Sequence, residues 1–290
     1  MGYKVDNAVI LAAGASSRFA PLSYERPKAL IEVKGEVLIE RQIRQLMEAG
    51  IPEIILVTGY KKEQFSYLQD KFRVKLIENP EYQYRNNHSS IYRVKEFLHN
   101  TYICSSDNYF ADNPFECEVM DCYYSAVYAE GWTAEWCMEE DSEGYISDIH
   151  VGGKASWYML GHAFWTEVFS RNFMEILEKI YEQPKTKELL WEAILKENLH
   201  SLKMKIRRYS NEMIYEFDTL DELRCFDSSY RKDTRSQILK WIAQRLGCRE
   251  EQIEEVRAFK GMYNEATGFR FRTGADEYEY RYMDKALYRL

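Results

Sequence analysis

The sequence predicts an α/β protein built on a mixed, mostly parallel sheet, with helices on both faces and a small antiparallel subregion. Over residues 8–105, short apolar runs alternate with stretches whose apolar residues recur at helical spacing. This alternation is typical of parallel sheets, because each connection between two parallel strands needs a crossover, usually a helix. After Pro114 short strands follow one another directly, which indicates antiparallel pairing.

Each expected element follows from its local pattern. Apolar runs predict buried strands, and apolar residues at helical spacing predict amphipathic helices. In the first part we expect strands at 8–12, 53–58, 74–77 and 101–105, with helices at 37–49, 61–71 and 90–98. After Pro114 we expect strands at 123–130, 133–138, 145–150 and 157–161, a turn at 141–144, helices at 166–181 and 187–198, late strands at 203–208 and 213–217, and a closing helix at 220–226.

Composition narrows the class of protein. The net charge is −8 and the lysines and arginines are scattered, so a nucleic-acid partner is not predicted. No apolar run approaches the roughly 20 residues of a membrane span, so no membrane contact is expected. The N-terminus enters a strand-like run without a cationic region or a cleavage site, which argues against secretion. Six cysteines without a Cys-x-x-Cys pair predict reduced thiols in a cytoplasmic protein.

A loop of small residues directly follows the first buried strand, in the stretch ILAAGASSRFAPLSYERPKAL at 10–30. Ligands of parallel sheets bind at the carboxyl ends of strands, and small residues let backbone N–H groups approach an anion. Arg18 offers a planar fork of donors, and Lys28 offers a compact charge after Pro27. Together they suit a triphosphate or a pyrophosphate. The alternative is a plain turn with two solvated cations.

The string LAAG-x-S-x-R, followed by Pro-Lys-x-Leu, resembles the signature of nucleotidyltransferases, which join an NTP to a phosphorylated small molecule and release pyrophosphate. Ser16 departs from that signature, which usually has a second glycine there. Residues 6–227 most resemble bacterial CTP:phosphocholine cytidylyltransferases. This resemblance rests on VTGYKKEQFSYL (57–68), LIENPEYQYRNNHSSIY (76–92), SSDN (105–108), Glu135-Trp136 and IYEFDTLDEL (214–223).

The resemblance implies a Rossmann-like nucleotidyltransferase fold and Mg²⁺-dependent transfer of CMP from CTP to phosphocholine, which yields CDP-choline and pyrophosphate. Arg18 and Lys28 match the catalytic cations, and Asp107 and Asp218 match the metal-binding aspartates. Mg²⁺ accepts one or two carboxylates with water and phosphate, and the acceptor's own phosphate attacks, so no covalent nucleophile is required. The residues expected to bind the nucleotide are Leu11, Ala12, Ala13, Gly14, Ser16, Ser17, Asn79, Asn87 and Ser90.

A quaternary ammonium group has no N–H to donate, so proteins hold it with aromatic faces, often beside a carboxylate. By resemblance we expect Tyr92, Glu135 and Trp136 to bind the choline head. Glu130 and Glu135 leave a primary-amine acceptor such as 2-aminoethylphosphonate open, and a sugar 1-phosphate is a further alternative. A second alternative is a non-catalytic nucleotide-binding module that regulates a partner.

We place a domain boundary after Ser229, between a cytidylyltransferase domain at 1–229 and a tail at 230–290. Asp233 is expected to cap a helix that ends at Gly247, and a short β-unit follows. The tail, with its loop at 260–264, resembles the start of a bacterial choline kinase, and no kinase activity is expected from it. We expect the tail to be dispensable for the transfer. Its apolar helix stripe needs a surface to cover it, in this chain, in a second copy or in a choline kinase.

Overall fold

The computed structural model describes residues 2–261 and 266–290, and the chain folds into two compact units. The first unit runs up to Gly14 and continues from Ile39 to Glu216. The second unit joins two distant stretches, Ala15–Leu38 and Phe217–Leu290. The boundary predicted after Ser229 lies inside the second unit, and the functional division there stays a prediction.

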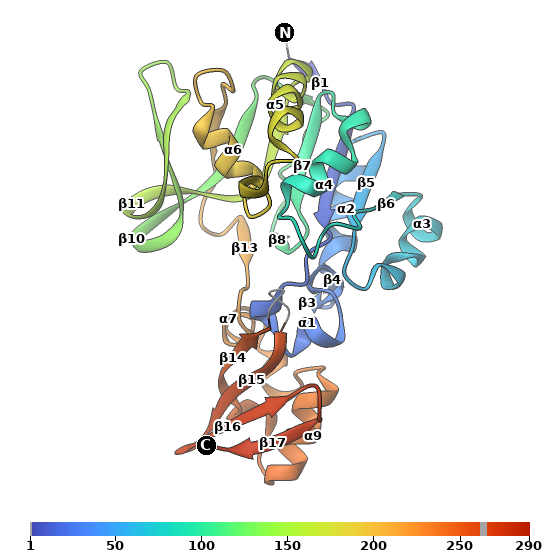
Figure 1. Cartoon of the computed structure of the whole chain (residues 1–290), viewed down its shortest axis with the longest axis vertical. Coiled ribbons are helices and arrows are strands. Elements are labelled where there is room, and N and C mark those ends of the chain that lie inside the picture. The colour runs from blue at the N-terminus through green and yellow to red at the C-terminus, as the bar shows by residue number, and fades with distance from the viewer. Residues whose placement is uncertain (1, 262–265) are drawn as a thin grey trace. The chain divides into compact units, whose positions relative to one another are not determined.

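A seven-stranded sheet forms the centre of the first unit, in the order β12-β10-β11-β7-β2-β5-β6 (Figure 1). Strand β2 pairs in parallel with β5 and β7, and β6 pairs in parallel with β5. Strand β11 pairs antiparallel with β7 and β10, so the mixed, mostly parallel sheet is confirmed. The strands are β2 (Asn7–Ala12), β5 (Ile54–Thr58), β6 (Lys75–Glu78), β7 (Thr101–Ser105), β10 (Tyr123–Glu140), β11 (Ile146–Trp165) and β12 (Lys205–Arg208).

Two small antiparallel pairs complete the strands of this unit, β1 (Tyr3–Lys4) with β9 (Glu118–Val119) and β8 (Asn108–Phe110) with β13 (Ile214–Glu216). The helices and 3₁₀ turns of this unit are α2 (Leu38–Glu48), η3 (Lys62–Phe65), α3 (Tyr67–Phe72), α4 (His88–Arg93), η4 (Lys95–Phe97), α5 (Glu167–Ile180), η5 (Pro184–Thr186) and α6 (Trp191–Glu197).

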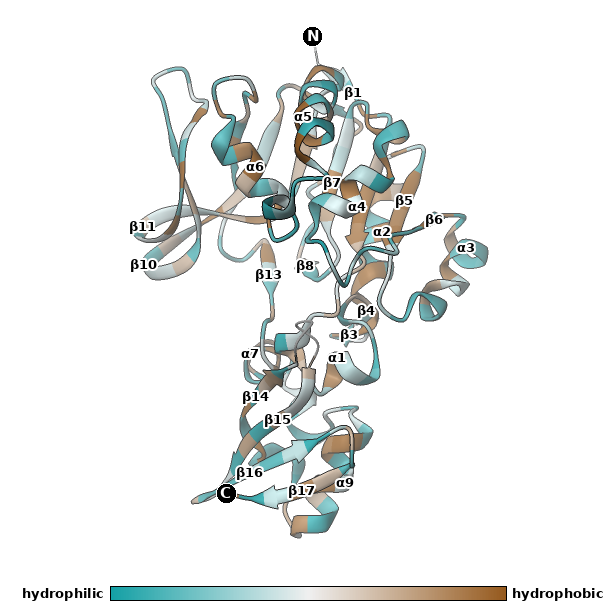
Figure 2. Ribbon diagram, viewed as in Figure 1, coloured by the Kyte–Doolittle hydropathy of each residue, from teal (hydrophilic) through white to brown (hydrophobic). Residues whose placement is uncertain are grey.

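Buried side chains alternate along the central strands and fill both faces of the sheet. Val9 of β2 and Ile55 of β5 belong to the main core, which also includes residues of α4, α5 and α6. Ile10 and Leu56 follow them directly and point to the opposite face, where they are fully buried too. Figure 2 shows the hydrophobic colour along β5 in the sheet. Two covered faces are what a parallel sheet requires.

Some predicted elements differ in length from those observed. The helix expected at 61–71 is split into η3 and α3, and the helix expected at 90–98 is split into α4 and η4. The four strands expected between 123 and 161 are two long strands, β10 and β11, with several register shifts between them. A bulge interrupts the alternation of apolar and polar residues, but it bends the strand without ending it. The sequence pattern therefore suggested strand ends at positions where β10 and β11 continue. The predicted turn is confirmed by Gly144 at φ 81.

The second unit contains short helices and a four-stranded antiparallel sheet in the order β14-β15-β16-β17, which confirms the expected β-unit. The cap of α9 is Ser236, whose side chain accepts from the N–H of Leu239, and not Asp233, which lies three residues earlier and pairs with Lys240 at 2.8 Å. Residues 262–264 of the kinase-like loop lie outside the described residues. The elements are η1 (Ser17–Phe19), α1 (Leu22–Glu25), η2 (Lys28–Leu30), β3 (Glu32–Val33), β4 (Glu36–Val37), α7 (Leu220–Phe226), α8 (Ser229–Lys232), α9 (Gln237–Leu246), η6 (Glu250–Gln252), β14 (Glu254–Lys260), β15 (Ala266–Thr273), β16 (Asp276–Arg281) and β17 (Ala286–Arg289).

The apolar stripe predicted on α9 consists of Ile238, Leu239, Ile242 and Leu246, and it is covered in part, since Ile238 and Leu246 are half-buried. Leu239 and Ile242 are fully buried, and the ring of Trp241 contacts that of Tyr280 on β16. In the part of the chain that the structure describes, no helix combines the length and the apolar character needed to cross a membrane.

Candidate nucleotide-binding site

The small-residue loop begins at the carboxyl end of β2, as the sequence predicts. A Cβ added to Gly14 would meet no described atom within 4 Å, so this glycine leaves space on the outside of the loop. At Gly59 a Cβ would lie 2.8 Å from the carbonyl oxygen of Ala13, which in turn accepts a hydrogen bond from the N–H of Tyr60 at 3.0 Å. Gly59 therefore lets the end of β5 support the loop, a role that the sequence analysis missed.

Ser16 adopts left-handed backbone angles, φ 46 and ψ 49. Glycine is favoured at such angles, because a Cβ crowds the neighbouring carbonyl there. The structure thus gives the physical reason for the glycine that the signature usually has at this position. Serine preserves the conformation at a cost of about 1 kcal/mol.

Arg18 and Lys28 converge on one carboxylate within the second unit. Arg18 Nη1 lies 2.7 Å from Asp218 Oδ2, and Lys28 Nζ lies 3.8 Å from Asp218 Oδ1. The Lys28 side chain is only 4% exposed, whereas the Arg18 side chain is 68% exposed. A buried ammonium needs a compensating anion, and an exposed guanidinium is available to a ligand.

Asp218 is held in place by the start of α7. Its N–H donates to Glu222 Oε2 at 2.6 Å, and Thr219 and Glu222 form a capping box. Asp221 and Glu222 lie in the first turn of this helix, where negative charge is favourable. The cap fixes the backbone that presents the Asp218 carboxylate.

Asp107 follows β7 in the first unit. Strands β2 and β7 are parallel neighbours with Leu11 opposite Ser105, so Asp107 and Gly14 both follow strand ends at one edge of the sheet. Among the described residues, no group of three or more His, Cys, Asp or Glu side chains is suited to hold a metal. Mg²⁺ takes few protein carboxylates and completes its shell with phosphate and water, so a role for Asp107 and for Asp218 in holding this ion stays a prediction.

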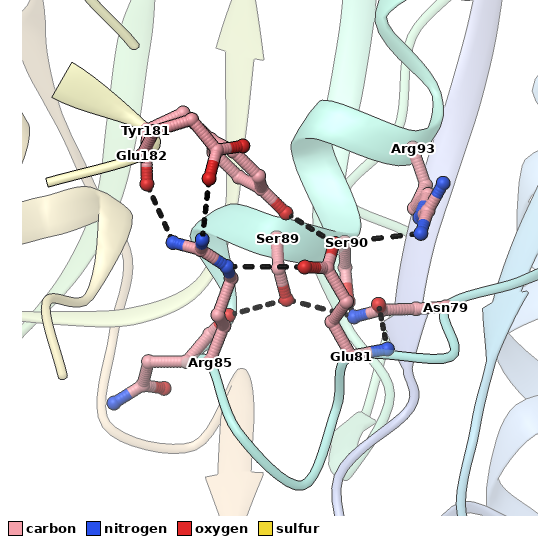
Figure 3. Close-up of polar contacts among 9 residues, drawn as sticks. Asn79, Glu81, Arg85, Ser89, Ser90, Arg93, Tyr181 and Glu182 are labelled. Atoms are coloured by element: carbon pink, nitrogen blue, oxygen red, sulfur yellow. Dashed lines mark hydrogen bonds and ion pairs between the residues drawn. The ribbon is translucent and has the colours of Figure 1, made fainter. Parts of the chain in front are cut away.

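Asn79 is buried and is at the centre of a polar network in the first unit (Figure 3). Its Nδ2 donates to Ser89 Oγ at 2.8 Å and to Ser90 Oγ at 3.1 Å, and its Oδ1 accepts from the N–H of Glu81 at 3.0 Å. These bonds hold the segment that follows β6 against α4. The structure therefore brings Asn79 and Ser90 together, and their contact with a nucleotide stays a prediction.

Glu81 connects this network to Tyr181, Arg85 and Arg93. It accepts from Tyr181 Oη at 2.6 Å and from Arg85 Nε at 3.1 Å, and Arg93 lies at 3.4 Å (Figure 3). Burial alone would raise the pKa of Glu81, but the hydrogen bonds from Tyr181 and Arg85 outweigh it and hold the pKa below its usual value. The ring of Tyr92 stacks on that of Tyr181 with 3.9 Å between centroids, so Tyr181 covers one face of the Tyr92 ring.

Asn87 lies beside a carboxylate that the sequence analysis did not identify. Its Oδ1 accepts from the N–H of Trp191 at 2.8 Å, and its Nδ2 donates to Glu192 Oε2 at 3.2 Å. Tyr124 donates to the other oxygen of Glu192 at 3.0 Å. Burial raises the pKa of Glu192, although these two hydrogen bonds oppose the rise. His88 is fully buried, and its Nδ1 bonds the carbonyl of Leu189 at 2.7 Å.

A second group of aromatic and acidic residues lies where β10 and β11 run together. Trp136 is partly buried against the main core, and the neighbouring Glu135 is exposed. Burial raises the pKa of Tyr158, and the negative charges of Glu135 and Glu216 raise it further. The charge of Glu216 also acts on Tyr124. Glu135 lies on β10, Tyr158 on β11 and Glu216 on β13, so the charges of two other strands act on Tyr158.

The α/β fold, the small-residue loop after β2 and the cations that follow this loop define a nucleotide-binding enzyme of the nucleotidyltransferase class. Comparison with known proteins agrees: a family model, the MobA-like NTP transferase domain, matches residues 8–186. The chain belongs to this family.

Two curated relatives are similar over most of their length. The choline-phosphate cytidylyltransferase of Streptococcus pneumoniae is 36% identical over 217 residues, covering 75% of this chain and 95% of that protein. The 2-aminoethylphosphonate cytidylyltransferase of Lancefieldella rimae is 33% identical over 229 residues, covering 77% and 93%. A solved structure of the Streptococcus pneumoniae CTP:phosphocholine cytidylyltransferase covers 78% of this chain and 99% of that chain, with a TM-score of 0.74 at 36% identity.

More distant structures share the fold alone. The inositol-1-phosphate CTP transferase of T. maritima has a TM-score of 0.59 at 16% identity, and covers 77% of this chain and 93% of that chain.

Proposed function

We propose that this protein transfers CMP from CTP to phosphocholine and thereby forms CDP-choline and pyrophosphate. The observation that supports it most is the pairing of Arg18 and Lys28 with Asp218 beside the loop of the nucleotidyltransferase signature. The similarity to cytidylyltransferases that use choline phosphate or 2-aminoethylphosphonate supports the choice of nucleotide and of acceptor class.

In the proposed reaction a phosphate oxygen of the acceptor forms a bond to the α-phosphorus of CTP, while the bond from that phosphorus to the pyrophosphate breaks. Arg18 and Lys28 bind phosphate oxygens whose charge grows in the transition state. Asp107 and Asp218 are the residues that would hold Mg²⁺, which neutralises phosphate charge when bound. The small residues from Ala12 to Ser17 offer backbone N–H groups to the phosphates.

The acceptor's head group is proposed to bind the second group of residues, Trp136 with Glu135, Tyr158 and Glu216. An aromatic face attracts a quaternary ammonium, and nearby carboxylates add an electrostatic attraction. The same carboxylates would also accept hydrogen bonds from a primary amine. This acidic surrounding and the relative from Lancefieldella rimae favour 2-aminoethylphosphonate as the second candidate acceptor.

A panel of acceptors with CTP and Mg²⁺ tests the proposal, with pyrophosphate release as the readout. We expect phosphocholine to give the highest kcat/KM, above 2-aminoethylphosphonate and a sugar 1-phosphate. Faster turnover of 2-aminoethylphosphonate would transfer the assignment to that acceptor. No pyrophosphate from any acceptor, with CTP binding retained, would favour the non-catalytic regulatory module.

We also propose a link between residues 230–290 of the second unit and choline metabolism. The resemblance of these residues to the start of a choline kinase links them to the class of enzyme that would make phosphocholine. Association with a choline kinase or with a second copy of this chain would be detected by light scattering with and without the kinase.

A further inference from the structure

We propose that the tail, residues 230–290, is a positioning element for Arg18 and Lys28, and that Glu25 is the residue that transmits its effect. This inference rests on the proposed function of these two cations. It replaces our expectation from the sequence that the tail is dispensable for the transfer. The relevant contacts all lie within the second unit, which joins the tail to Ala15–Leu38.

Glu25 is the last residue of α1, and it binds the first turn of α9. Its Oε1 accepts from Ser236 Oγ at 3.0 Å and from the N–H of Ile238 at 2.8 Å, and its Oε2 accepts from the N–H of Gln237 at 3.0 Å. The first N–H groups of a helix have no partner inside the helix, and a negative charge is favourable there. One carboxylate of the signature loop therefore satisfies the start of the tail helix.

Aromatic contacts join the same two stretches. The ring of Tyr24 stacks on that of Tyr282 with 3.6 Å between centroids and 7° between planes. Tyr230 is buried and donates to the carbonyl oxygen of Glu32 at 2.6 Å. Arg235 Nη1 donates to the same carbonyl at 2.9 Å. The tail thus contacts this loop on both sides of Lys28.

The position of these contacts along the chain connects them to the two cations. Helix α1 lies between Arg18 and Lys28, so a displacement of α1 moves the backbone that carries both. Strand β14 of the tail also packs against η1, which contains Arg18. Charges bind a ligand strongly only when they are held in place, so a displacement of α1 should weaken the binding of CTP phosphates by both cations.

The test compares Glu25→Gln with Glu279→Gln in the full-length protein. Glu279 is a matched control: it is a buried carboxylate of the tail that pairs with Arg270 at 3.0 Å and with Arg281 at 2.7 Å. We expect Glu25→Gln to raise KM for CTP about tenfold, as for loss of one charge-assisted contact, and to leave KM for phosphocholine within about twofold. Glu279→Gln should leave both values close to those of the wild type.

Hydrogen exchange of residues 15–30 provides a readout that needs no substrate. We expect faster exchange there in Glu25→Gln than in Glu279→Gln at equal Tm. Tyr282→Ala should act in the same direction as Glu25→Gln, and Tyr282→Phe, which keeps the stacked ring, should not.

A folded Glu25→Gln protein with unchanged KM for CTP and unchanged exchange would overturn the inference. Equal effects of the two glutamate variants would show a purely structural role and would overturn it too. If the wild type prefers another acceptor, the proposed function fails while the exchange experiment still decides this inference.

Discussion

Arg18 and Asp218 form an ion pair in which 2.7 Å separates Nη1 from Oδ2. Lys28 approaches the other carboxylate oxygen at 3.8 Å. Under the proposed function, both cations bind phosphates of CTP. The phosphates of the nucleotide would therefore compete with Asp218 for Arg18 and Lys28. Once these cations bind phosphate, the Asp218 carboxylate oxygens would be available to Mg²⁺.

Asp218→Asn tests this exchange. We expect kcat to fall by about a hundredfold, because under the proposed function a carboxylate that would hold Mg²⁺ is lost. KM for CTP should not rise, since Arg18 loses its competing partner. Asp221→Asn is the control, because Asp221 pairs with Arg224 at 3.1 Å in the first turn of α7. Pyrophosphate release across a Mg²⁺ titration is the measurement, and full activity of Asp218→Asn would exclude it as a metal ligand.

Gly14 and Gly59 are expected to respond differently to alanine. A Cβ at Gly14 meets no described atom within 4 Å, so Gly14→Ala should keep its Tm. Under the proposed function it should raise KM for CTP, because a methyl group would occupy space that the phosphates need. A Cβ at Gly59 lies 2.8 Å from the Ala13 carbonyl, so Gly59→Ala should cost about 1–3 kcal/mol of unfolding free energy. Thermal unfolding and steady-state kinetics of both variants are the measurements. An equal loss of Tm in the two variants would contradict the view that Gly59 supports the loop while Gly14 faces open space.

Local sequence patterns predicted the central strands well. Strand β5 and helix α5 lie within one or two residues of their expected bounds, because apolar periodicity and burial agree there. The choice of cap at α9 was wrong, since Asp233 and Ser236 are both good capping residues and the sequence does not show which one the fold uses. The helix begins at Gln237, directly after Ser236, while Asp233 lies three residues earlier and pairs with Lys240.

Other features depend on contacts between segments that are distant in sequence. Glu192 lies in an ordinary helical pattern, and only the fold brings Tyr124 and Asn87 to its carboxylate. Glu135 of β10 and Glu216 of β13 are far apart in the sequence, and only in the fold do both charges act on Tyr158 of β11. The family resemblance of residues 214–223 identified Asp218 as a candidate metal ligand. Its ion pair with Arg18 became visible only in the tertiary structure.

His162 predicts how stability depends on pH. Burial lowers its pKa to about 3, so below pH 6.5 the unfolded chain binds a proton that the folded chain does not. The stability contribution of the neutral ring is therefore complete above pH 6.5 and decreases as the pH falls toward 3. Each unit of pH costs about 1.4 kcal/mol in this window.

Denaturant unfolding of His162→Gln between pH 4.5 and 7 checks this expectation. The slope of unfolding free energy against pH should be smaller in the variant than in the wild type, by the amount that corresponds to uptake of one proton. Tyr123→Phe should keep the slope, because it removes the hydroxyl 3.0 Å from Nε2 and leaves the ring buried. An unchanged slope in His162→Gln would show that another group controls acid sensitivity.

Trp136→Ala tests the proposed site for the acceptor's head group. Trp136 is partly buried against the main core and adjoins Glu135 in the sequence, whereas Trp132 on the same strand is 75% exposed. If Trp136 faces a quaternary ammonium, its removal should raise KM for phosphocholine about tenfold and leave KM for CTP unchanged, because the cation–π attraction acts on one substrate only. Trp132→Ala should change neither value. A rise in both KM values with a lower Tm would instead mean that Trp136 supports the core, and the acceptor's head group would then have to bind elsewhere.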